Sequence, residues 1–322
     1  MSKREIGGYF ELEHFSGKHY HDGAIKLNCG RACLEYLIKL RGIRKILLPD
    51  YLCDSVSSLC CRCGLEIKTY SVNESFLPEG LGDIEEGWLY LVDYYGQLVD
   101  ESIQSYAEQC SGRIIIDESQ NFFAGQRMGL DTLYTCRKWF GVSDGAYLYT
   151  AHSDRLNAHI PQAKSAQSMG YLLGRFESNA SSFFTASKAN NKRFCDEPLQ
   201  TMSVLTDNIL CGIDYGRVQA TRNENYEVVC EALSGINQLR NLKRPAVPFM
   251  YPLLVDGAQR IREHAAKRLV YIPTLWPNVI ERSASGEIAR RYSTDILPLP
   301  IDQRYDLQDM QRMIEVVREC ML

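Results

Sequence analysis

The sequence predicts an α/β fold, in which a mostly parallel sheet carries helices on both faces, followed by a small C-terminal α+β domain. Between residues 25 and 150, short and continuously apolar runs alternate with segments of helical periodicity, a pattern typical of strands that are covered on both faces. A length of 322 residues also suggests two domains, at about 150 residues per domain. We therefore expect a large α/β domain over 1–225 and a small domain over 226–322.

The expected strands are short and end at turn residues. In the large domain they lie at 25–28, 46–48, 67–70, 89–92, 114–116, 130–135 and 146–149. The stretch 151–225 is richer in Ser, Asn and Ala and predicts helices that pack on the sheet and reach toward a partner subunit. In the small domain we expect strands at 251–255, 271–273 and 296–299, and helices at 222–242 and 307–320.

Composition excludes several classes of function. With 45% hydrophobic and 24% charged residues, the chain is that of an ordinary globular protein. Its net charge of −4 provides no basic field for a nucleic-acid backbone. No apolar run approaches the roughly 20 residues of a membrane span, and no secretory signal is recognised at the N-terminus. We expect a cytoplasmic protein with neither nucleic acid nor membrane as a partner.

The cysteines predict free thiols. Twelve cysteines are scattered through a long chain without a secretory signal, which indicates a reducing compartment. The cluster Cys60–Cys63 has no second Cys or His pair at zinc-site spacing. We interpret it as a helix end that Gly64 stops, and expect no metal site.

Residues that follow the strands are the candidates for chemistry, because ligands of open α/β sheets bind at the carboxyl ends of the strands. After the first strand, Gly30 permits a tight turn into a helix whose free N–H groups could bind a phosphate. Any turn from a strand to a helix gives this same signal.

Asp117 ends a wholly apolar strand, where an acid is costly to bury without a partner. It faces a ligand, or it caps the next helix; the local sequence supports both equally. The run Asp93–Gln97 also follows a strand, and we interpret its tyrosines as packing rather than as walls of a pocket.

A lysine follows another strand end. Thr135 closes the strand and Lys138 comes three residues later, next to Trp139 and Phe140. Partial desolvation by these rings would lower the pKa of the amine and favour a nucleophile able to form a Schiff base. A surface lysine in a turn is the alternative.

Together, an anion site, an acid and a lysine are the groups that pyridoxal phosphate requires. On the residues Gly30, Asp117 and Lys138 the sequence resembles the DegT/DnrJ/EryC1/StrS family of pyridoxal-phosphate-dependent sugar aminotransferases, which have the type I aminotransferase fold. The resemblance runs over most of the chain, from Gly7 to Pro300.

The resemblance implies roles for individual residues. Asp117 would be the partner of the pyridinium nitrogen, and Gln120 would contact the side of the ring that carries the hydroxyl. Lys138 would be the lysine that binds the cofactor covalently and shuttles a proton, with Thr135 as a ligand of the phosphate. The phosphate-binding turn of the family falls on Gly30, Arg31 and Ala32.

Two segments depart from the family. At the position where the family places an aromatic ring on the cofactor this chain has Cys53, so either Tyr51 takes that place or stacking is weak. The partner-subunit segment Asn-Tyr-Arg-Met is not recognisable; Met202 and Asn208 lie near the corresponding place. A homodimer with shared active sites is implied by the resemblance.

The activity implied is transfer of an amino group from an amino acid, with glutamate as the expected donor, to a keto sugar. The sugar would be nucleotide-linked and used for surface polysaccharide or glycosides. A pyridoxal-phosphate enzyme of another reaction type and a non-catalytic relative acting as a binding or assembly module are the alternatives. A nicotinamide dehydrogenase is disfavoured, because no Gly-x-Gly-x-x-Gly follows a strand.

Other polar residues are given no role in chemistry. We place His14, His19 and His21 in a solvated loop. We place Arg217 and Arg222 on a solvated helix face. Trp276 either lines the substrate entrance or packs the small domain.

Overall fold

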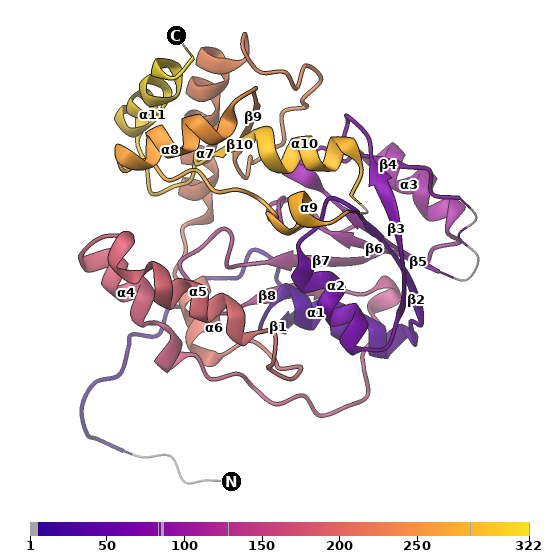
Figure 1. Ribbon diagram of the computed structural model, residues 1–322. Helices are drawn as coiled ribbons and strands as arrows, with labels where there is room; N and C mark the ends of the chain where they lie inside the picture. Colours follow the sequence, from indigo (N-terminus) through magenta and orange to yellow (C-terminus); the bar gives the residue numbers. More distant parts are fainter. Residues whose placement is uncertain (1–5, 83, 85–86, 128, 284, 322) are drawn as a thin grey trace.

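The computed structural model describes residues 6–82, 84, 87–127, 129–283 and 285–321. Its main feature is an eight-stranded sheet in the order β1-β8-β7-β6-β5-β2-β3-β4 (Figure 1). The five strands from β7 to β3 in this order run parallel, whereas β1, β8 and β4 pair antiparallel at the two sides. The predicted mostly parallel sheet is confirmed. The strands are β1 (Ile25–Leu27), β2 (Lys45–Pro49), β3 (Glu66–Val72), β4 (Pro78–Glu79), β5 (Trp88–Val92), β6 (Ile114–Asp117), β7 (Asp131–Thr135) and β8 (Ala146–Tyr149).

Helices cover the sheet and extend from it after β8, as expected for 151–225 (Figure 1). Helix α2 ends at Arg62, and Gly64 follows with a φ of +75°, so the helix-end interpretation of Cys60–Cys63 is confirmed. All twelve cysteines are free. The helices are α1 (Gly30–Arg41), α2 (Asp54–Arg62), α3 (Asp100–Gln109), α4 (Gly170–Glu177), α5 (Phe184–Arg193), α6 (Val204–Cys211) and α7 (Tyr215–Leu233).

The C-terminal part forms a second layer above the sheet (Figure 1). Strand β9 (Tyr251–Leu254) pairs antiparallel with β10 (Ile296–Leu299). The strand predicted at 271–273 does not form; Pro273 has no N–H to donate to a neighbouring strand. The helices here are α8 (Ala258–Lys267), α9 (Asn278–Glu281), α10 (Glu287–Asp295) and α11 (Leu307–Glu319).

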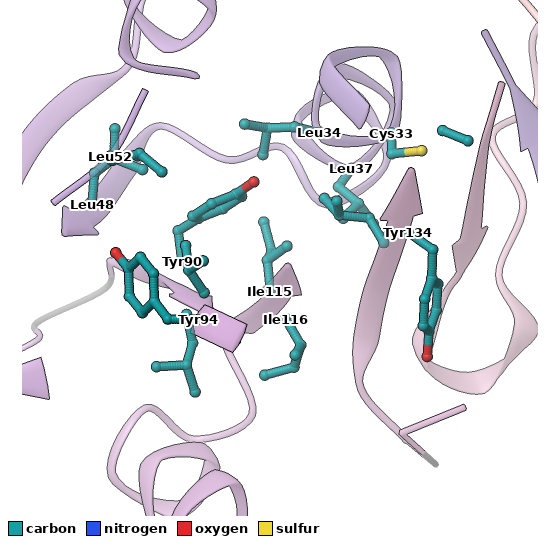
Figure 2. Close-up of a cluster of buried hydrophobic side chains, with 14 of the residues drawn as sticks. Cys33, Leu34, Leu37, Leu48, Leu52, Tyr90, Tyr94, Ile115, Ile116 and Tyr134 are labelled. Carbon is teal, nitrogen blue, oxygen red and sulfur yellow. The ribbon is translucent and has the colours of Figure 1, made fainter. Parts of the chain in front are cut away.

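Two hydrophobic cores support these layers. The first lies between the sheet and its helices, and Figure 2 shows side chains of α1 packing beside those of β5 and β6. The second lies among α7, α8, α11 and the β9–β10 pair. Helix α7 contributes Val218 to the first core and Tyr226 to the second. The domain boundary that we predict at 225 falls between these two residues and remains a prediction.

None of the helices in the described ranges combines the length and the apolar character that a bilayer crossing requires.

The prediction of a solvated loop is wrong for two of the three N-terminal histidines. His14 is exposed, but His19 and His21 are buried against the sheet. The ring of His21 lies 4.0 Å from that of Tyr134, and its Nε2 is 2.7 Å from the carbonyl oxygen of Phe122. Burial lowers the pKa of His21 to about 4. This aromatic surface is assembled from separate strands, so the local sequence does not reveal it.

The first core predicts a large effect of Leu37→Ala. Leu37 is 0% exposed, so truncation leaves a cavity between α1 and the sheet. We expect the free energy of unfolding to fall by about 2–5 kcal/mol, measured by urea denaturation. Leu173→Ala on α4, where the side chain is 59% exposed, should change it by less than about 0.5 kcal/mol. Equal effects of the two substitutions would contradict this description of the core.

Candidate active site

The carboxyl ends of β6 and β7 bring an acid and an amine together. Asp117 is the last residue of β6, Thr135 is the last residue of β7, and Lys138 lies in the turn that follows. Lys138 is exposed, and desolvation of its amine by the neighbouring protein lowers the pKa. The carboxylate of Asp117 and the thiol of Cys53 act in the opposite direction, so both lie near the amine.

Asp117 is held at both oxygens. Its Oδ2 accepts a hydrogen bond of 2.7 Å from the hydroxyl of Tyr90, and its Oδ1 accepts one of 2.8 Å from the N–H of Ser119. The alternative of a helix cap is wrong, because no helix follows in the described residues between β6 and β7. The fixed carboxylate therefore lies at the strand end close to Lys138.

Hydrogen bonds join the segment that follows Asp117 to the neighbouring segments. The amide oxygen of Gln120 accepts a hydrogen bond of 3.0 Å from the N–H of Tyr95, and the indole of Trp139 donates to the carbonyl oxygen of Ser119 at 3.0 Å. Tyr94 and Tyr95 are buried, which confirms their interpretation as packing. Gln120 is thus part of the same strand-end region, although its oxygen is already engaged.

Tyr51 and Cys53, the two candidates for the ring-stacking position, lie in the loop after β2 and have different surroundings. Tyr51 is 0% exposed, with Trp276 at 4.6 Å and Tyr94 at 5.3 Å between ring centroids. Tyr51 is therefore enclosed by aromatic rings, and its role as a cofactor contact remains a prediction. Cys53 is half-buried immediately before α2 and lies near Lys138. Trp276 packs against Tyr51 and the first core rather than the small domain, so its second interpretation is wrong.

The first turn of α1 is free of acidic side chains. Gly30 begins the helix, and the thiol of Cys29 accepts a hydrogen bond from the N–H of Ala32 at 3.4 Å. Arg31 donates to the carbonyl oxygen of Asn191 at 3.0 Å and to the sulfur of Cys195 at 3.1 Å. The predicted turn into the helix therefore forms, with a guanidinium group at its second residue, and its binding of an anion remains a prediction.

Sequence reasoning missed Arg137, which precedes Lys138. Its guanidinium group lies 4.6 Å from the centroid of the Phe194 ring and donates to the side-chain oxygen of Asn191. Its position next to Lys138 in the same turn is the signal that could have found it. The approach of Phe194 is a long-range contact, which local sequence does not predict.

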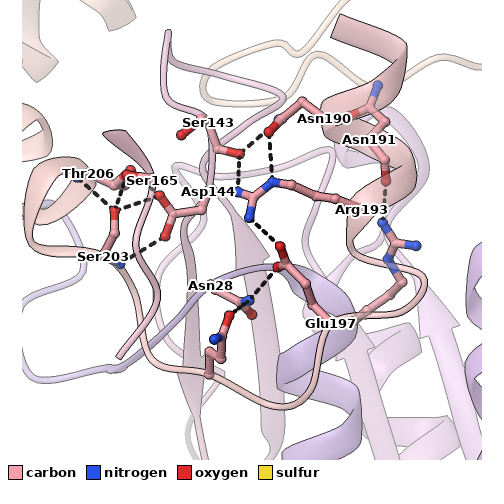
Figure 3. A network of polar contacts seen from close by, with 12 residues as sticks. Asn28, Ser143, Asp144, Ser165, Asn190, Asn191, Arg193, Glu197, Ser203 and Thr206 are labelled. Atoms are coloured by element: carbon pink, nitrogen blue, oxygen red, sulfur yellow. Dashed lines mark hydrogen bonds and ion pairs between the residues drawn. The ribbon is translucent and has the colours of Figure 1, made fainter. Parts of the chain in front are cut away.

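The loop that follows Lys138 is held by polar contacts from α5 and α6 (Figure 3). The carboxylate of Asp144 accepts hydrogen bonds from the N–H of Ser203 at 2.8 Å and from its hydroxyl at 2.7 Å. Asn190 and Arg193 both donate to the carbonyl oxygen of Ser143. These contacts fix the backbone between the Lys138 turn and β8.

Arg222 connects the same turn to the segment that leads into β9. The prediction of a solvated face is wrong for Arg222, which is 1% exposed, and correct for Arg217. The guanidinium group of Arg222 lies 4.3 Å from the centroid of the Trp139 ring and donates to the carbonyl oxygen of Phe249 at 2.9 Å. Gln303 accepts from Arg222 and donates to the carbonyl oxygen of Trp139 at 2.7 Å. Burial lowers the pKa of Arg222 to about 10.

The arrangement joins three chemical abilities. An amine of lowered pKa can attack a carbonyl carbon, a fixed carboxylate can keep a neighbouring heterocycle protonated, and a helix N-terminus flanked by guanidinium groups can bind a dianion.

Solved structures share this fold. No family model and no curated protein matches the sequence. The aminotransferase PseC of Helicobacter pylori, involved in the biosynthesis of pseudoaminic acid, aligns with a TM-score of 0.67 at 13% identity, covering 96% of this chain and 92% of that one.

Two further structures give the same result. A DegT DnrJ EryC1 StrS aminotransferase from Brucella abortus aligns with a TM-score of 0.62 at 15% identity over 92% of this chain and 85% of its own. The PLP-form of Spr1654 from Streptococcus pneumoniae aligns with a TM-score of 0.63 at 10% identity over 92% and 87%. The chain therefore has the fold of this class of aminotransferases, as the resemblance implied.

The site predicts an unusual reactivity of Lys138 toward amine reagents. Because burial lowers its pKa, the rate of modification should reach half its maximum at a lower pH than for a lysine in a model peptide. Asp117→Asn removes a charge that raises this pKa and should move the midpoint lower still. Mass spectrometry of the modified peptide measures both profiles. A midpoint at or above that of the model peptide would exclude this environment.

Arg222→Met keeps the volume of the side chain but leaves the carbonyl oxygen of Phe249 and the amide of Gln303 without their donor. We expect the free energy of unfolding to fall by about 2–3 kcal/mol in urea denaturation. Arg217→Met, on the exposed face of the same helix, should change it by less than about 0.5 kcal/mol. If both variants change the free energy of unfolding equally, the connecting role of Arg222 is refuted.

Proposed function

We propose that the protein is a pyridoxal-phosphate-dependent aminotransferase that moves an amino group from an amino acid, with glutamate as the donor, to a keto sugar. The observation that carries the proposal is the convergence of Lys138, Asp117 and the first turn of α1 at one edge of the sheet. The fold shared with PseC and with the PLP-form of Spr1654 supports it.

The residues present fit the cofactor. Lys138 offers the amine, Asp117 a carboxylate for the ring nitrogen, and Gly30, Arg31 and Ala32 the N-terminal turn for the phosphate. Among the described residues, the Nε of Arg137 in addition has no hydrogen-bond partner although it is buried, as expected of a group that binds an anion. Thr135 and Gln120 remain proposed contacts at the phosphate and at the ring hydroxyl side.

The chain's own groups then move the protons. Bound pyridoxal phosphate supplies an acceptor for the electrons released when the donor loses its Cα proton. Lys138 Nζ takes that proton and later returns it as an acid. Asp117, fixed by Tyr90 and Ser119, keeps the ring nitrogen protonated.

A homodimer belongs to the proposal. Helices α4 and α5 expose large apolar side chains, with Phe176 at 92% and Phe184 at 57% exposure. Burial of such groups stabilises association. We propose a cytoplasmic homodimer with shared sites, acting on a nucleotide-linked keto sugar for surface polysaccharide or glycosides.

The proposal predicts a covalent adduct on Lys138. The protein mixed with pyridoxal phosphate should turn yellow, and borohydride followed by peptide mapping should trap the cofactor on Lys138. Lys138→Ala should abolish the trapped adduct, whereas Lys267→Ala, an exposed lysine on α8, should not. A protein that stays colourless, with Lys138→Ala behaving as the parent, would refute the proposal and favour a binding or assembly module.

The reaction class needs a second assay. With glutamate and a nucleotide-linked keto sugar as substrates, the protein should produce 2-oxoglutarate and an amino sugar in equal amounts. Mass spectrometry measures both products. Turnover of amino acids alone, with elimination products and no dependence on a keto sugar, would instead indicate a pyridoxal-phosphate enzyme of another reaction type.

A further inference from the structure

We propose that Arg31 and Arg137 together bind the phosphate group of the cofactor, as a pair of guanidinium groups from one chain. This inference rests on the proposed function and specifies how the phosphate end of the site is built. It assigns Arg137 to the site and gives the side chain of Arg31 a defined ligand.

Three guanidinium groups gather around one ring. Arg193, Arg137 and Arg31 lie 4.1, 4.6 and 5.7 Å from the centroid of Phe194. Arg193 is neutralised by Glu197 at 2.6 Å. Among the described residues, no carboxylate forms an ion pair with Arg31 or Arg137, whose acceptors are neutral groups of Asn191 and Cys195.

The two remaining charges are costly without an anion. The Nε of Arg137 is buried and has no acceptor within the described part of the chain. Burial lowers the pKa of Arg137, and the nearby charges of Arg31 and Arg193 lower it further. A buried cation beside like charges destabilises the protein unless a counter-charge offsets it. The cluster therefore points to a bound anion.

The position of the cluster identifies the anion. Arg31 is the second residue of α1, and the N-cap residue Cys29 lies close to both arginines. A small pocket opens beside this turn. Its lining includes Cys29, Arg31 and Phe194, and also the acidic residues Glu35 and Glu197. Arg137 adjoins Lys138, so a ligand joined to that amine can reach the cluster with its other end.

Phosphate suits these donors better than a single negative charge does. Guanidinium groups bind phosphate oxygens through paired N–H donors, and two of them match a dianion. The free N–H groups of the α1 turn add to the attraction. Pyridoxal phosphate carries its aldehyde and its phosphate on one ring, which is the combination that Lys138 and the arginine pair select.

The experiment compares pyridoxal phosphate with pyridoxal, which lacks the phosphate. Absorbance titrations of the full chain give both affinities for the parent, Arg137→Gln and Arg31→Gln. Each variant should bind pyridoxal phosphate at least tenfold more weakly, since a charge-assisted contact is lost, and pyridoxal with unchanged affinity. Arg217→Gln is the matched control: it removes an exposed guanidinium group from α7, and should change neither affinity more than threefold.

Other results of the titrations would contradict particular parts of the proposal. Equal losses for both ligands would assign Arg137 to positioning of the Lys138 turn. An equal effect of Arg217→Gln would indicate that the net charge of the protein, rather than contact with the phosphate, sets the affinity. If Arg137→Gln fails to fold, as circular dichroism would show, Arg31→Gln decides. A parent protein that binds both ligands equally refutes the phosphate contact alone, while one that binds neither refutes the proposed function with it.

Discussion

The guanidinium group of Arg222 is the contact on which the arrangement of the site depends. It lies against Trp139, next to Lys138, and donates to the backbone of the Pro248–Phe249 segment that leads into β9. A buried cation needs all of its donors satisfied, so these segments cannot separate without a large free-energy cost. The position of the Lys138 amine relative to Phe249, 6.0 Å from its ring, follows from this connection.

The strand ends carry an uneven distribution of charge. Arg31, Arg137 and Lys138 gather there, and the carboxylate of Asp117 is the acid that lies near the amine. At the position next to Lys138 where an aromatic ring would add stacking area, the chain has the small thiol of Cys53. If a planar anionic ligand binds there, we expect charge at its phosphate end to hold it more than contact with its ring.

Likeness to aminotransferases at 10–15% identity is compatible with these changes. The sheet needs only apolar strands of the right spacing, which many sequences satisfy. The acid and the amine lie at strand ends, where the sheet geometry brings them together whatever the surrounding loops contain. Loops and helices outside the sheet, such as α4 and α5, are free to differ.

The sequence alone determined the α/β class, seven of the eight strands of the large sheet and the end of α2, and it predicted that Asp117, Lys138 and the α1 turn meet. These follow from local patterns, because strand periodicity and strand order place the residues after each strand at one edge. Only the tertiary structure decided that Tyr51 is enclosed by aromatic rings, that His21 and Arg222 are buried and that Arg137 faces Phe194. Each of these depends on contacts between segments far apart in the chain, and no local pattern encodes which distant side chain will cover a given residue.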